Sequence, residues 1–437
     1  MKMKRRQFIT KASTVFAGVN FLPSHVWAES PNGKLNLIHI GVGGMGGSDR
    51  GALRGHAKVN VLGLCDIDAG RLAAAKKDVP MAETYDDYRE IFEKMGDRID
   101  AVCVSTPDHT HAPASMLALN LGKHVYCQKP LTHDIYEARQ VRLIAAKQGV
   151  ATQMGIQIHS SNEYRTATQM IQDGVIGKVS EVHAWSNKNW GYDGPAFQGE
   201  DPIPASLNWD MWIGTAEMRA FKKGVYHPAN WRKLIDFGTG TLGDMGVHIF
   251  DTPFRALELT FPVSVKTSCR AATGVGHPGK NLVRYEFPGT KHTTDKLIWK
   301  WYDGGYAPPK ELQLGDRKLP GQGSLFIGEK GKMLLPHIGN PQFFDNENEM
   351  LRIRLPKLDR INHYHQWADA AMGEGKASAN FDYAGKLTES LLLGCVANRF
   401  PDEELLWDAE NLKFTNKPEA DKIIRRTYRK GFEVENL

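Results

Sequence analysis

Short apolar runs alternate with helix-like stretches over residues 34–155. Each run has the length and apolar content of a strand buried on both faces, and the stretches between runs repeat their apolar residues at helical spacing. Strands and helices in alternation predict a parallel sheet that is covered by helices on both faces. We expect strands at 35–41, 59–65, 101–105, 124–127 and 151–155, and helices at 71–77, 87–95, 114–121 and 135–148.

The pattern changes after residue 156. A helix-like stretch at 164–173 is followed by segments of alternating polar and apolar residues, which are typical of strands with one buried face. Long connections rich in Gly, Pro and Trp separate them, and helical periodicity returns at 364–372 and 383–398. These features predict a second, α+β domain at 156–437 with a mostly antiparallel, open sheet. Its strands are expected at 179–186, 263–267, 282–287 and 296–301.

The net charge of the chain is concentrated at its N-terminus. The 437 residues carry 55 Lys and Arg against 50 Asp and Glu, a formal charge of +5. Residues 1–28 hold five basic residues and no acid, so the remainder is formally neutral. A nucleic-acid or anionic-membrane partner would require a basic patch in the folded part. We therefore expect no nucleic-acid partner and no membrane attachment of the mature protein.

Residues 1–28 resemble a twin-arginine export signal. Arg5-Arg6-Gln7-Phe8-Ile9-Thr10-Lys11 is followed by a weakly apolar stretch at 12–22 and a small-residue exit at 26–28. Eleven residues are too few to span a bilayer, which takes about 20. We expect a cleaved signal peptide and a periplasmic protein, exported in folded form with a tightly held cofactor. The alternative is a basic tail on a cytosolic protein.

Five cysteines, an odd number with wide spacing, argue against a disulfide or zinc framework. We interpret them as small buried side chains and expect no metal site.

A glycine-rich loop follows the first expected strand. Gly41-Val42-Gly43-Gly44-Met45-Gly46 fits the G-x-G-x-x-G pattern of a dinucleotide site, in which glycines permit a tight turn, close approach of the pyrophosphate and close helix packing. Asp66 ends the next strand, where a carboxylate accepts hydrogen bonds from the adenosine ribose. The same carboxylate repels a 2′-phosphate, so we expect NAD rather than NADP, with Arg71 the residue most able to reverse this preference.

Two motifs stand at the ends of later strands of the expected parallel sheet, where ligands of such sheets bind. They are Ser105-Thr106-Pro107-Asp108-His109-Thr110-His111 and Gln128-Lys129-Pro130. In the second domain, Asp244 and His248 are four residues apart, so a helix there would project both from one face. A lysine, a carboxylate and an imidazole beside a nicotinamide would suit hydride transfer between an alcohol and a ketone.

Together with the glycine loop, these motifs resemble the Gfo/Idh/MocA oxidoreductases, the group of glucose-fructose oxidoreductase and inositol dehydrogenase. The resemblance covers about residues 35–399. It implies an NAD(P)-binding Rossmann domain at 34–155, a substrate domain at 156–437 and a homo-oligomer, either a dimer or a tetramer. It indicates the family but no particular substrate.

The resemblance also implies roles for single residues. Lys129 would stabilise the developing oxyanion, His248 would be the base, and Asp244 would bind substrate hydroxyls or orient the imidazole. A histidine titrates near neutral pH unaided, which favours His248 over the carboxylate as base. The implied cofactor contacts outside the glycine loop are Thr106, Pro107, His111, Gln128 and Lys129. Many members carry Glu-Lys-Pro where this chain has Gln128-Lys129-Pro130, which puts the usual proton relay in doubt.

Each of these residues also has a purely structural interpretation. Lys129 could be a solvated surface lysine, Asp244 a helix cap and His248 a hydrogen-bonded core histidine. His111 is equally consistent with a cofactor neighbour and with a residue of a helix start.

Half of the ten tryptophans lie between residues 185 and 231, interleaved with Asn, Lys, His and Arg. Aromatic faces stack on the apolar faces of sugar rings, although any single one of these residues could belong to the domain core. We expect Trp190, Tyr226, Trp231 and Arg232 to contact the substrate together with Lys129, Asp244 and His248, and we expect that substrate to be a sugar, a glycoside or a cyclitol.

The sequence therefore predicts an NAD(P)-dependent oxidoreductase that acts on a carbohydrate hydroxyl. Because exported NADH has no evident recycling pool, one alternative is an NAD-dependent glycosidase that oxidises, eliminates, hydrates and reduces again around a retained cofactor. A second alternative is a non-catalytic sugar-binding protein with a structural nucleotide.

Overall fold

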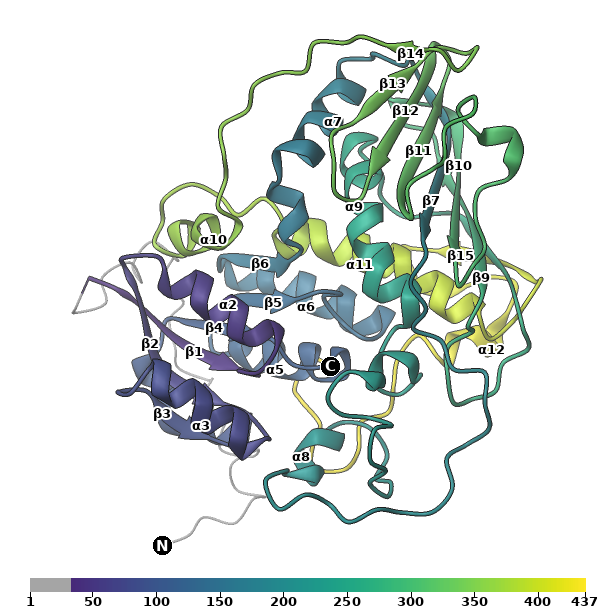
Figure 1. Cartoon of the computed structure of the whole chain (residues 1–437). Coiled ribbons are helices and arrows are strands. Elements are labelled where there is room, and N and C mark those ends of the chain that lie inside the picture. The colour runs from purple at the N-terminus through teal and green to yellow at the C-terminus, as the bar shows by residue number, and fades with distance from the viewer. Residues whose placement is uncertain (1–32) are drawn as a thin grey trace, which may run out of the picture.

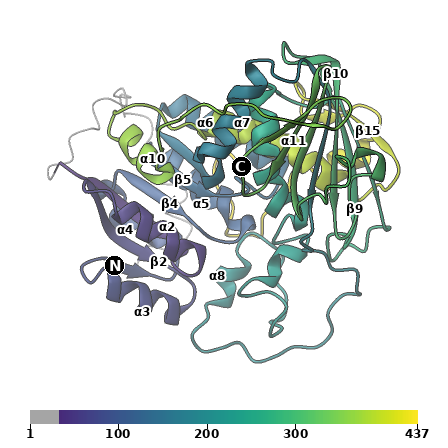
Figure 2. The same ribbon diagram turned by 45° about the horizontal axis from the view of Figure 1, so that its top comes forward.

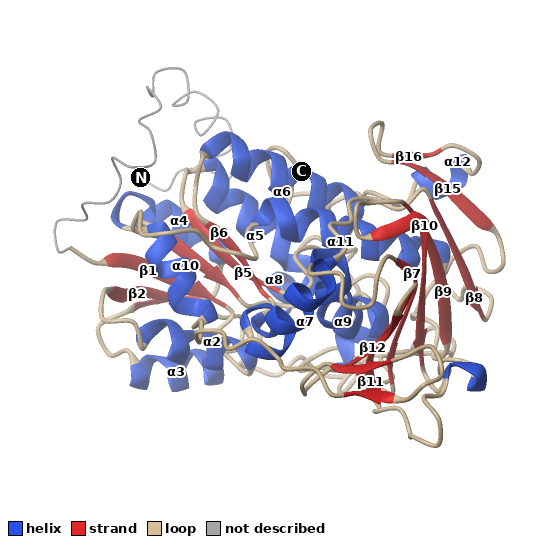
Figure 3. Ribbon diagram, turned by 90° about the horizontal axis from the view of Figure 1, so that it is seen from above, coloured by secondary structure: helices blue, strands red, loops and turns tan. Residues whose placement is uncertain are grey.

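The computed structural model describes residues 33–437, which form two sheets with helices packed between them (Figures 1 and 3). The first sheet is parallel and has six strands in the order β3-β2-β1-β4-β5-β6. This is the strand order of the doubly wound dinucleotide-binding fold, with the topological switch between β1 and β4. The strands are β1 (Leu35–Ile40), β2 (Val59–Cys65), β3 (Glu83–Tyr85), β4 (Ala101–Val104), β5 (His124–Gln128) and β6 (Thr152–Gly155).

The helices of this half begin at recognisable caps. Asp68 and Asp87 accept hydrogen bonds from the first turns of α3 and α4, and Asp134 forms a capping box with Glu137 at the start of α6. One start differs from the sequence expectation: α5 begins at Asp108, not at 114, because Pro107 precedes a favourable acidic first residue. The helices are α2 (Met45–Arg54), α3 (Ala69–Asp78), α4 (Tyr88–Met95), α5 (Asp108–Asn120) and α6 (Ile135–Gln148).

The second sheet confirms the expected mostly antiparallel domain. It has ten strands in the order β14-β13-β12-β11-β7-β10-β9-β8-β15-β16, and β7 and β10 are its one parallel pair among the described residues. All four strands expected from the sequence are present. The strands are β7 (Val179–Ser186), β8 (Ser264–Cys269), β9 (Asn281–Pro288), β10 (Thr293–Asp303), β11 (Gln322–Gly328), β12 (Gly331–Pro336), β13 (Gln342–Phe344), β14 (Met350–Leu351), β15 (Glu404–Asp408) and β16 (Lys413–Phe414).

Helices fill the space between the two sheets (Figure 3). α11 is buried along almost its whole length, and Tyr285 of the second sheet donates a hydrogen bond from its hydroxyl to the Leu391 carbonyl. From α9, Phe250 stacks on Trp299 with ring centroids 3.9 Å apart. These helices are α7 (Asn162–Gln172), α9 (Val247–Ala256) and α11 (Phe381–Ala397), with a π-helical segment, η6 (Leu242–Gly246), leading into α9.

Residues after the second sheet's main strands return to the first domain. α10 (His363–Ala371) packs on α2, and its Trp367 lies edge-on to Tyr126 of β5. Beyond α12 (Pro418–Asp421), Arg426 forms ion pairs with Asp134 and Glu137 of the α6 capping box. The remaining single-turn helices are η3 (Gly96–Arg98), η4 (Gln157–Ser160), η5 (Asn230–Lys233) and η7 (Lys310–Leu312).

Residues 187–237, which we call the aromatic lobe, lie beside α3 in two views (Figures 1 and 2). The lobe contains α8 (Trp209–Ile213) and has its own core, in which Trp209 stacks on Trp212 with centroids 4.9 Å apart. Within residues 33–437 no helix has the length and apolarity needed to cross a bilayer.

Candidate active site

The glycine loop connects β1 to α2 at the switch point of the parallel sheet. Gly41 has φ +83°, and a Cβ there would lie 2.6 Å from the Ser105 carbonyl oxygen. A Cβ on Gly46 would lie 1.9 Å from the Gly41 carbonyl oxygen. Gly44 precedes α2 with φ +53°, and Met45, the first helical residue, is exposed. Glycine is therefore required where the turn and the helix meet.

Asp66 lies directly beneath this loop. Its Oδ2 accepts hydrogen bonds from the Val42 N–H at 2.8 Å and the Gly43 N–H at 3.3 Å. Burial raises the pKa of the carboxyl, and hydrogen bonds from the Asp68 and Val42 N–H groups partly offset the effect. The Arg71 side chain lies against Gly43, where a Cβ would come within 2.4 Å of Arg71 Cδ. A carboxylate and a guanidinium therefore border the same part of the loop.

The structure brings Lys129 and Asp244 together. Lys129 Nζ at the tip of β5 donates to Asp244 Oδ1 at 2.7 Å and to the Asp244 carbonyl oxygen at 3.0 Å. Arg232 Nε donates to the same Oδ1 at 3.2 Å. Burial alone would raise the pKa of this carboxyl, but Lys129 and Arg232 hold it well below its ordinary value. Asp244 is thus a carboxylate shared by two cations.

His248 lies one turn further along, where η6 passes into α9. Its ring centroid is 5.5 Å from that of His337, which follows β12. Burial, helped by Lys129 and His337, lowers the pKa of His248 well below its ordinary value. The expectation of a histidine that titrates near neutral pH is therefore wrong for this environment. The imidazole is neutral at pH 7, and burial together with the two neighbouring basic groups makes it a weaker base than a free histidine.

The two strand-end motifs meet through a buried histidine. His111 Nδ1 lies 2.7 Å from the Pro130 carbonyl oxygen, and Nε2 lies 2.8 Å from the Thr106 carbonyl oxygen. Burial lowers the pKa of His111 to about 4. The ring thus lies between the two loops, and in its neutral form it donates a hydrogen bond to one of the two carbonyl oxygens at a time. Pro107 caps α5, and Gln128, the last residue of β5, is buried.

Sequence reasoning missed Asp108 as a member of the site. Its buried carboxyl accepts a hydrogen bond from Thr239 Oγ1 at 2.8 Å. Burial raises its pKa to about 7, although Arg232 and Lys129 act in the opposite direction. Asp108 belongs to the strand-end motif, which was a local signal. His337 had no such signal, because only the tertiary fold brings it to His248.

The aromatic residues divide into two groups. Arg232 lies over the rings of Trp231 and Trp190, at 4.3 Å and 5.6 Å from their centroids, so both border the cation that binds Asp244. Tyr226 is buried in the core of the aromatic lobe, with its ring 5.3 Å from Trp209. Trp231 belongs to that core as well. Trp190 is the more accessible of these rings.

Three buried polar atoms around this cluster have no partner among the described residues: Thr106 Oγ1, Trp190 Nε1 and His248 Nδ1. Buried polar groups are nearly always hydrogen-bonded, and a bound ligand with suitable donors and acceptors would satisfy these three. The glycine loop, Asp66 and these atoms fit a nicotinamide dinucleotide that extends from the loop toward Lys129.

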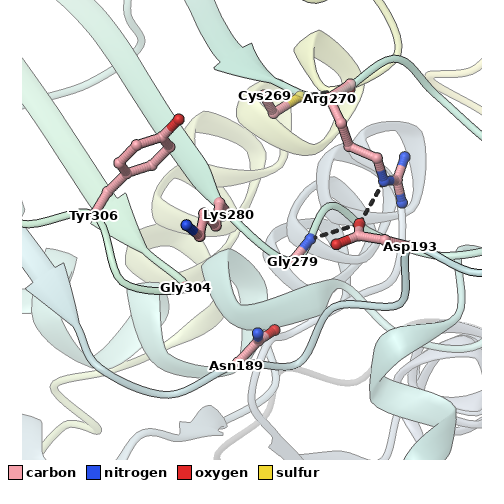
Figure 4. Close-up of a pocket in the computed structure, with 8 residues that line it drawn as sticks. All are labelled: Asn189, Asp193, Cys269, Arg270, Gly279, Lys280, Gly304 and Tyr306. Carbon is pink, nitrogen blue, oxygen red and sulfur yellow. Dashed lines mark hydrogen bonds and ion pairs between the residues drawn. The ribbon is translucent and has the colours of Figure 1, made fainter.

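A separate cavity of about 320 Å³ opens on the second domain (Figure 4). Asp193 and Arg270 point toward one another in it and form an ion pair. None of the site residues predicted from the sequence lines this cavity. Its walls are Asn189, Asp193, Cys269, Arg270, Gly279, Lys280, Gly304 and Tyr306.

The parallel sheet with its glycine loop, joined to a second domain whose η6 and α9 carry Asp244 and His248, defines a two-domain dinucleotide-binding protein of the oxidoreductase type. Comparison with family models agrees: residues 35–156 match the NAD-binding Rossmann fold of the Gfo/Idh/MocA oxidoreductase family, and residues 162–277 match its C-terminal alpha/beta domain. The chain belongs to the Gfo/Idh/MocA family.

Individual relatives agree with this assignment. Over 154 residues the chain is 30% identical to an inositol 2-dehydrogenase of Salmonella typhimurium, a match that covers 34% of this chain and 44% of that one. It is 26% identical over 211 residues to an NADP(+)-dependent D-xylose 1-dehydrogenase of Haloarcula marismortui, which covers 47% and 56% of the two chains. The chain therefore spans about half the length of these curated relatives.

A solved structure shows the same fold. The WlbA dehydrogenase of Bordetella pertussis, in complex with NADH and UDP-GlcNAcA, superposes with a TM-score of 0.60 at 14% identity, covering 86% of this chain and 99% of that one.

Proposed function

We propose that this protein transfers hydride between a nicotinamide cofactor and a secondary hydroxyl of a sugar or cyclitol. The observation that carries the proposal is the cluster of Lys129, Asp244 and Arg232 at the tip of β5, beside the glycine loop. The names of the inositol and xylose dehydrogenase relatives support the substrate class.

The protein's own groups supply binding and proton handling. The nicotinamide, when bound, accepts or returns the hydride. Lys129 donates a hydrogen bond to the reacting oxygen and stabilises negative charge there. Asp244 orients the ammonium from the other side. Neutral His248 accepts the hydroxyl proton at a ring nitrogen. We assign this role to Nδ1, because it has no other hydrogen-bond partner among the described residues.

Lys129→Ala tests the proposal. Removal of the ammonium should lower kcat by about 10² to 10⁴ with a responsive polyol, while NAD still binds, because the glycine loop and Asp66 are intact. NADH absorbance measures turnover, and quenching of tryptophan fluorescence measures NAD binding. Lys94→Ala, on the exposed face of α4, is the matched control and should keep full activity.

A Lys129→Ala protein with wild-type turnover would contradict the proposal. A wild-type protein that binds sugars without any turnover would instead indicate the non-catalytic sugar-binding alternative.

We propose NAD rather than NADP as the cofactor, on the position of the Asp66 carboxylate against the glycine loop. Arg71 lies close enough to the loop to bind a 2′-phosphate in its place. The relatives include an NADP(+)-dependent enzyme, so the ratio of the two activities must be measured.

A second candidate function, net glycoside cleavage with a retained cofactor, is favoured by the aromatic lobe. Its Ser206 and Asn208 exchange backbone hydrogen bonds with Ala69 and Ile67, both at 2.9 Å. In α8 of the lobe, the Trp212 carbonyl oxygen lies 2.9 Å from Nε2 of His109, which belongs to the strand-end motif that contains Thr106. The lobe thus bridges the two loops between which an adenosine lies in this fold, and would slow nucleotide exchange.

Two measurements separate these candidates. Purified protein is denatured and any released nucleotide is identified by mass, and native protein is incubated with aryl glycosides while NADH and free aglycone are followed. Aglycone release without net NADH would show the retained-cofactor reaction, and stoichiometric NADH from a free polyol would show the simple dehydrogenase.

We further propose that the protein is exported through the twin-arginine pathway and works as a homo-oligomer. The supporting residues, Arg5 to Lys11, lie outside the described residues, so the proposal rests on their sequence. Replacement of both arginines by lysine should leave the protein in the cytoplasm on cell fractionation. Light scattering of the mature protein tests the oligomer.

A further inference from the structure

Asp49, on the buried face of α2, carries a carboxylate that the proposed reaction does not use. Its Oδ2 accepts hydrogen bonds from Ser105 Oγ at 2.7 Å and Gln128 Nε2 at 2.9 Å. Its Oδ1 accepts from the Tyr364 hydroxyl at 2.8 Å and again from Gln128 Nε2 at 3.0 Å. Both oxygens are therefore bonded, although the side chain is fully buried.

The partners of Asp49 come from three elements that meet around the candidate site. Ser105 follows the tip of β4, Gln128 ends β5, and Tyr364 belongs to α10. The chain of bonds continues, because Gln128 Oε1 accepts from the Lys129 N–H at 3.3 Å. The Gln128 side chain thus links Asp49 to the backbone N–H of Lys129.

This arrangement accounts for glutamine at position 128. An ionised carboxylate only accepts hydrogen bonds, and a glutamine amide can donate to it. A glutamate at 128 would place two carboxylates in one buried site, where they cannot both be ionised without strong repulsion. The Gln128 amide also lies against Gly155, where a Cβ would come within 2.7 Å of its Nε2.

We propose that Asp49 and Gln128 form a positioning pair for the reaction. The buried carboxylate holds the glutamine amide, and the glutamine in turn fixes the backbone of Lys129 so that its ammonium reaches the reacting oxygen. The inference rests on the proposed dehydrogenase function. Asp49 touches neither substrate nor cofactor in it and acts through Gln128.

An exchange of the two groups tests the pair. Asp49→Asn removes the charge and replaces one of the two oxygens that accept from Gln128 Nε2 by an NH2 group, which cannot accept. It should lower kcat about tenfold with little change in KM for the polyol, because a small misplacement of a reacting group is costly. Gln128→Glu pairs two carboxylates and should lower kcat and the melting temperature further. The double variant restores one carboxylate and one amide, and its kcat should recover to within about threefold of wild type.

The pH dependence of kcat supplies a readout that loss of stability alone would not move. In the double variant the carboxylate stands at position 128, next to Lys129. A closer negative charge stabilises the protonated ammonium, so the limb that reports it should move up by roughly 0.5 to 1 pH unit. In Asp49→Asn, NAD affinity, measured by fluorescence without turnover, should stay within about threefold, since neither the glycine loop nor Gln128 is replaced.

Glu389→Gln is the matched control, because Glu389 is an equally buried carboxylate, bound to Arg139 of α6. It should lower the melting temperature and leave the pH profile in place. If Gln128→Glu does not fold alone, rescue of its folding by Asp49→Asn supports the pair. The proposal is overturned if Asp49→Asn keeps wild-type kcat, or if the double variant is no better than the poorer single one. A wild-type protein without turnover overturns the proposed function instead.

Discussion

Lys129 and Asp244 are 115 positions apart in the chain and 2.7 Å apart in the structure. The sequence predicted that both belong to the site, because each stood in a motif of chemically suitable residues. It did not predict that Arg232 would share the carboxylate. Because both cations donate to Asp244 Oδ1, the carboxylate remains paired with Arg232 when Lys129 moves away. Lys129 is thereby free to reorient toward substrate without leaving a buried charge alone.

Asp66 provides a test of cofactor choice at the scale of one atom. Asp66→Asn keeps an oxygen that can accept the Val42 N–H and removes the charge that repels a 2′-phosphate. The ratio of kcat/KM for NAD over NADP should fall by about tenfold or more, since one charge contact is worth roughly 1 to 2 kcal/mol at such a site.

Initial rates with both cofactors measure that ratio. Asp97→Asn, an exposed acid of the same domain, removes the same charge at a distance and should leave the ratio unchanged. An unchanged ratio in Asp66→Asn would mean that Arg71 or the loop backbone sets the preference.

At the scale of elements, the absence of a side chain at Gly46 allows α2 to pack closely against the glycine loop. Gly46→Ala would place a Cβ 1.9 Å from the Gly41 carbonyl oxygen, whereas Gly51→Ala on the same helix meets nothing within 4 Å. We expect Gly46→Ala to cost about 2 kcal/mol or more of stability and to weaken NAD binding at least tenfold.

Gly51→Ala should stabilise the protein by roughly 0.5 to 1 kcal/mol, because alanine is the better helix former. Urea denaturation and NAD titration of both variants provide the comparison. Equal effects of the two substitutions would show that the close approach at Gly46 does not constrain the loop.

Elements with strong periodicity were predicted well, and the others depended on tertiary contacts. The strand at 59–65 and the helix at 135–148 match β2 and α6 residue for residue, since one is an apolar run and the other has a capping box and a glycine stop. β3 has three residues and no apolar run, so it gave no signal. The π-helical turn that carries Asp244 has no sequence signature, although such turns are frequent at functional sites.

The aromatic residues show the limit of prediction for the site. Composition indicated that tryptophans and tyrosines gather at 185–231, but it could not separate a ring that packs in a core from one that faces a ligand. Tyr226 lies in the core of the aromatic lobe and Trp190 lies beside Arg232, and only the path of the backbone distinguishes them.

Across the whole molecule, buried histidines predict an acid-sensitive fold. Burial lowers the pKa of eight histidines in the described part of the chain to about 3 or 4, so the folded state keeps them neutral while the unfolded chain protonates them below its pKa of about 6.5. Their stabilising contribution is complete above pH 6.5 and is lost as the pH falls toward 4. The eight are His39, His109, His111, His124, His183, His277, His337 and His363.

Buried carboxyls act in the opposite direction. Burial raises the pKa of Asp108 and Asp134 to about 7 and of Asp303 to about 8, so the folded state binds these protons more tightly and gains stability as the pH falls below 7. These three groups do not offset the eight histidines, so the melting temperature should drop between pH 6.5 and 4.5. In His39→Leu the slope of the free energy of unfolding should fall by about 1.4 kcal/mol per pH unit, one proton's worth. A melting temperature that is flat over this range would contradict the buried, neutral state of these side chains.

The return of residues after 420 to the first domain has a consequence for the order of synthesis. Arg426 and Tyr428 hold the Glu137 carboxylate, and Arg89 of α4 reaches the Gly431 carbonyl oxygen. These contacts belong to the dinucleotide-binding domain, yet the residues that form them are synthesised only after the entire second sheet. The nucleotide domain therefore acquires these contacts last during synthesis, and we expect it to reach its full stability only after the second sheet has been made.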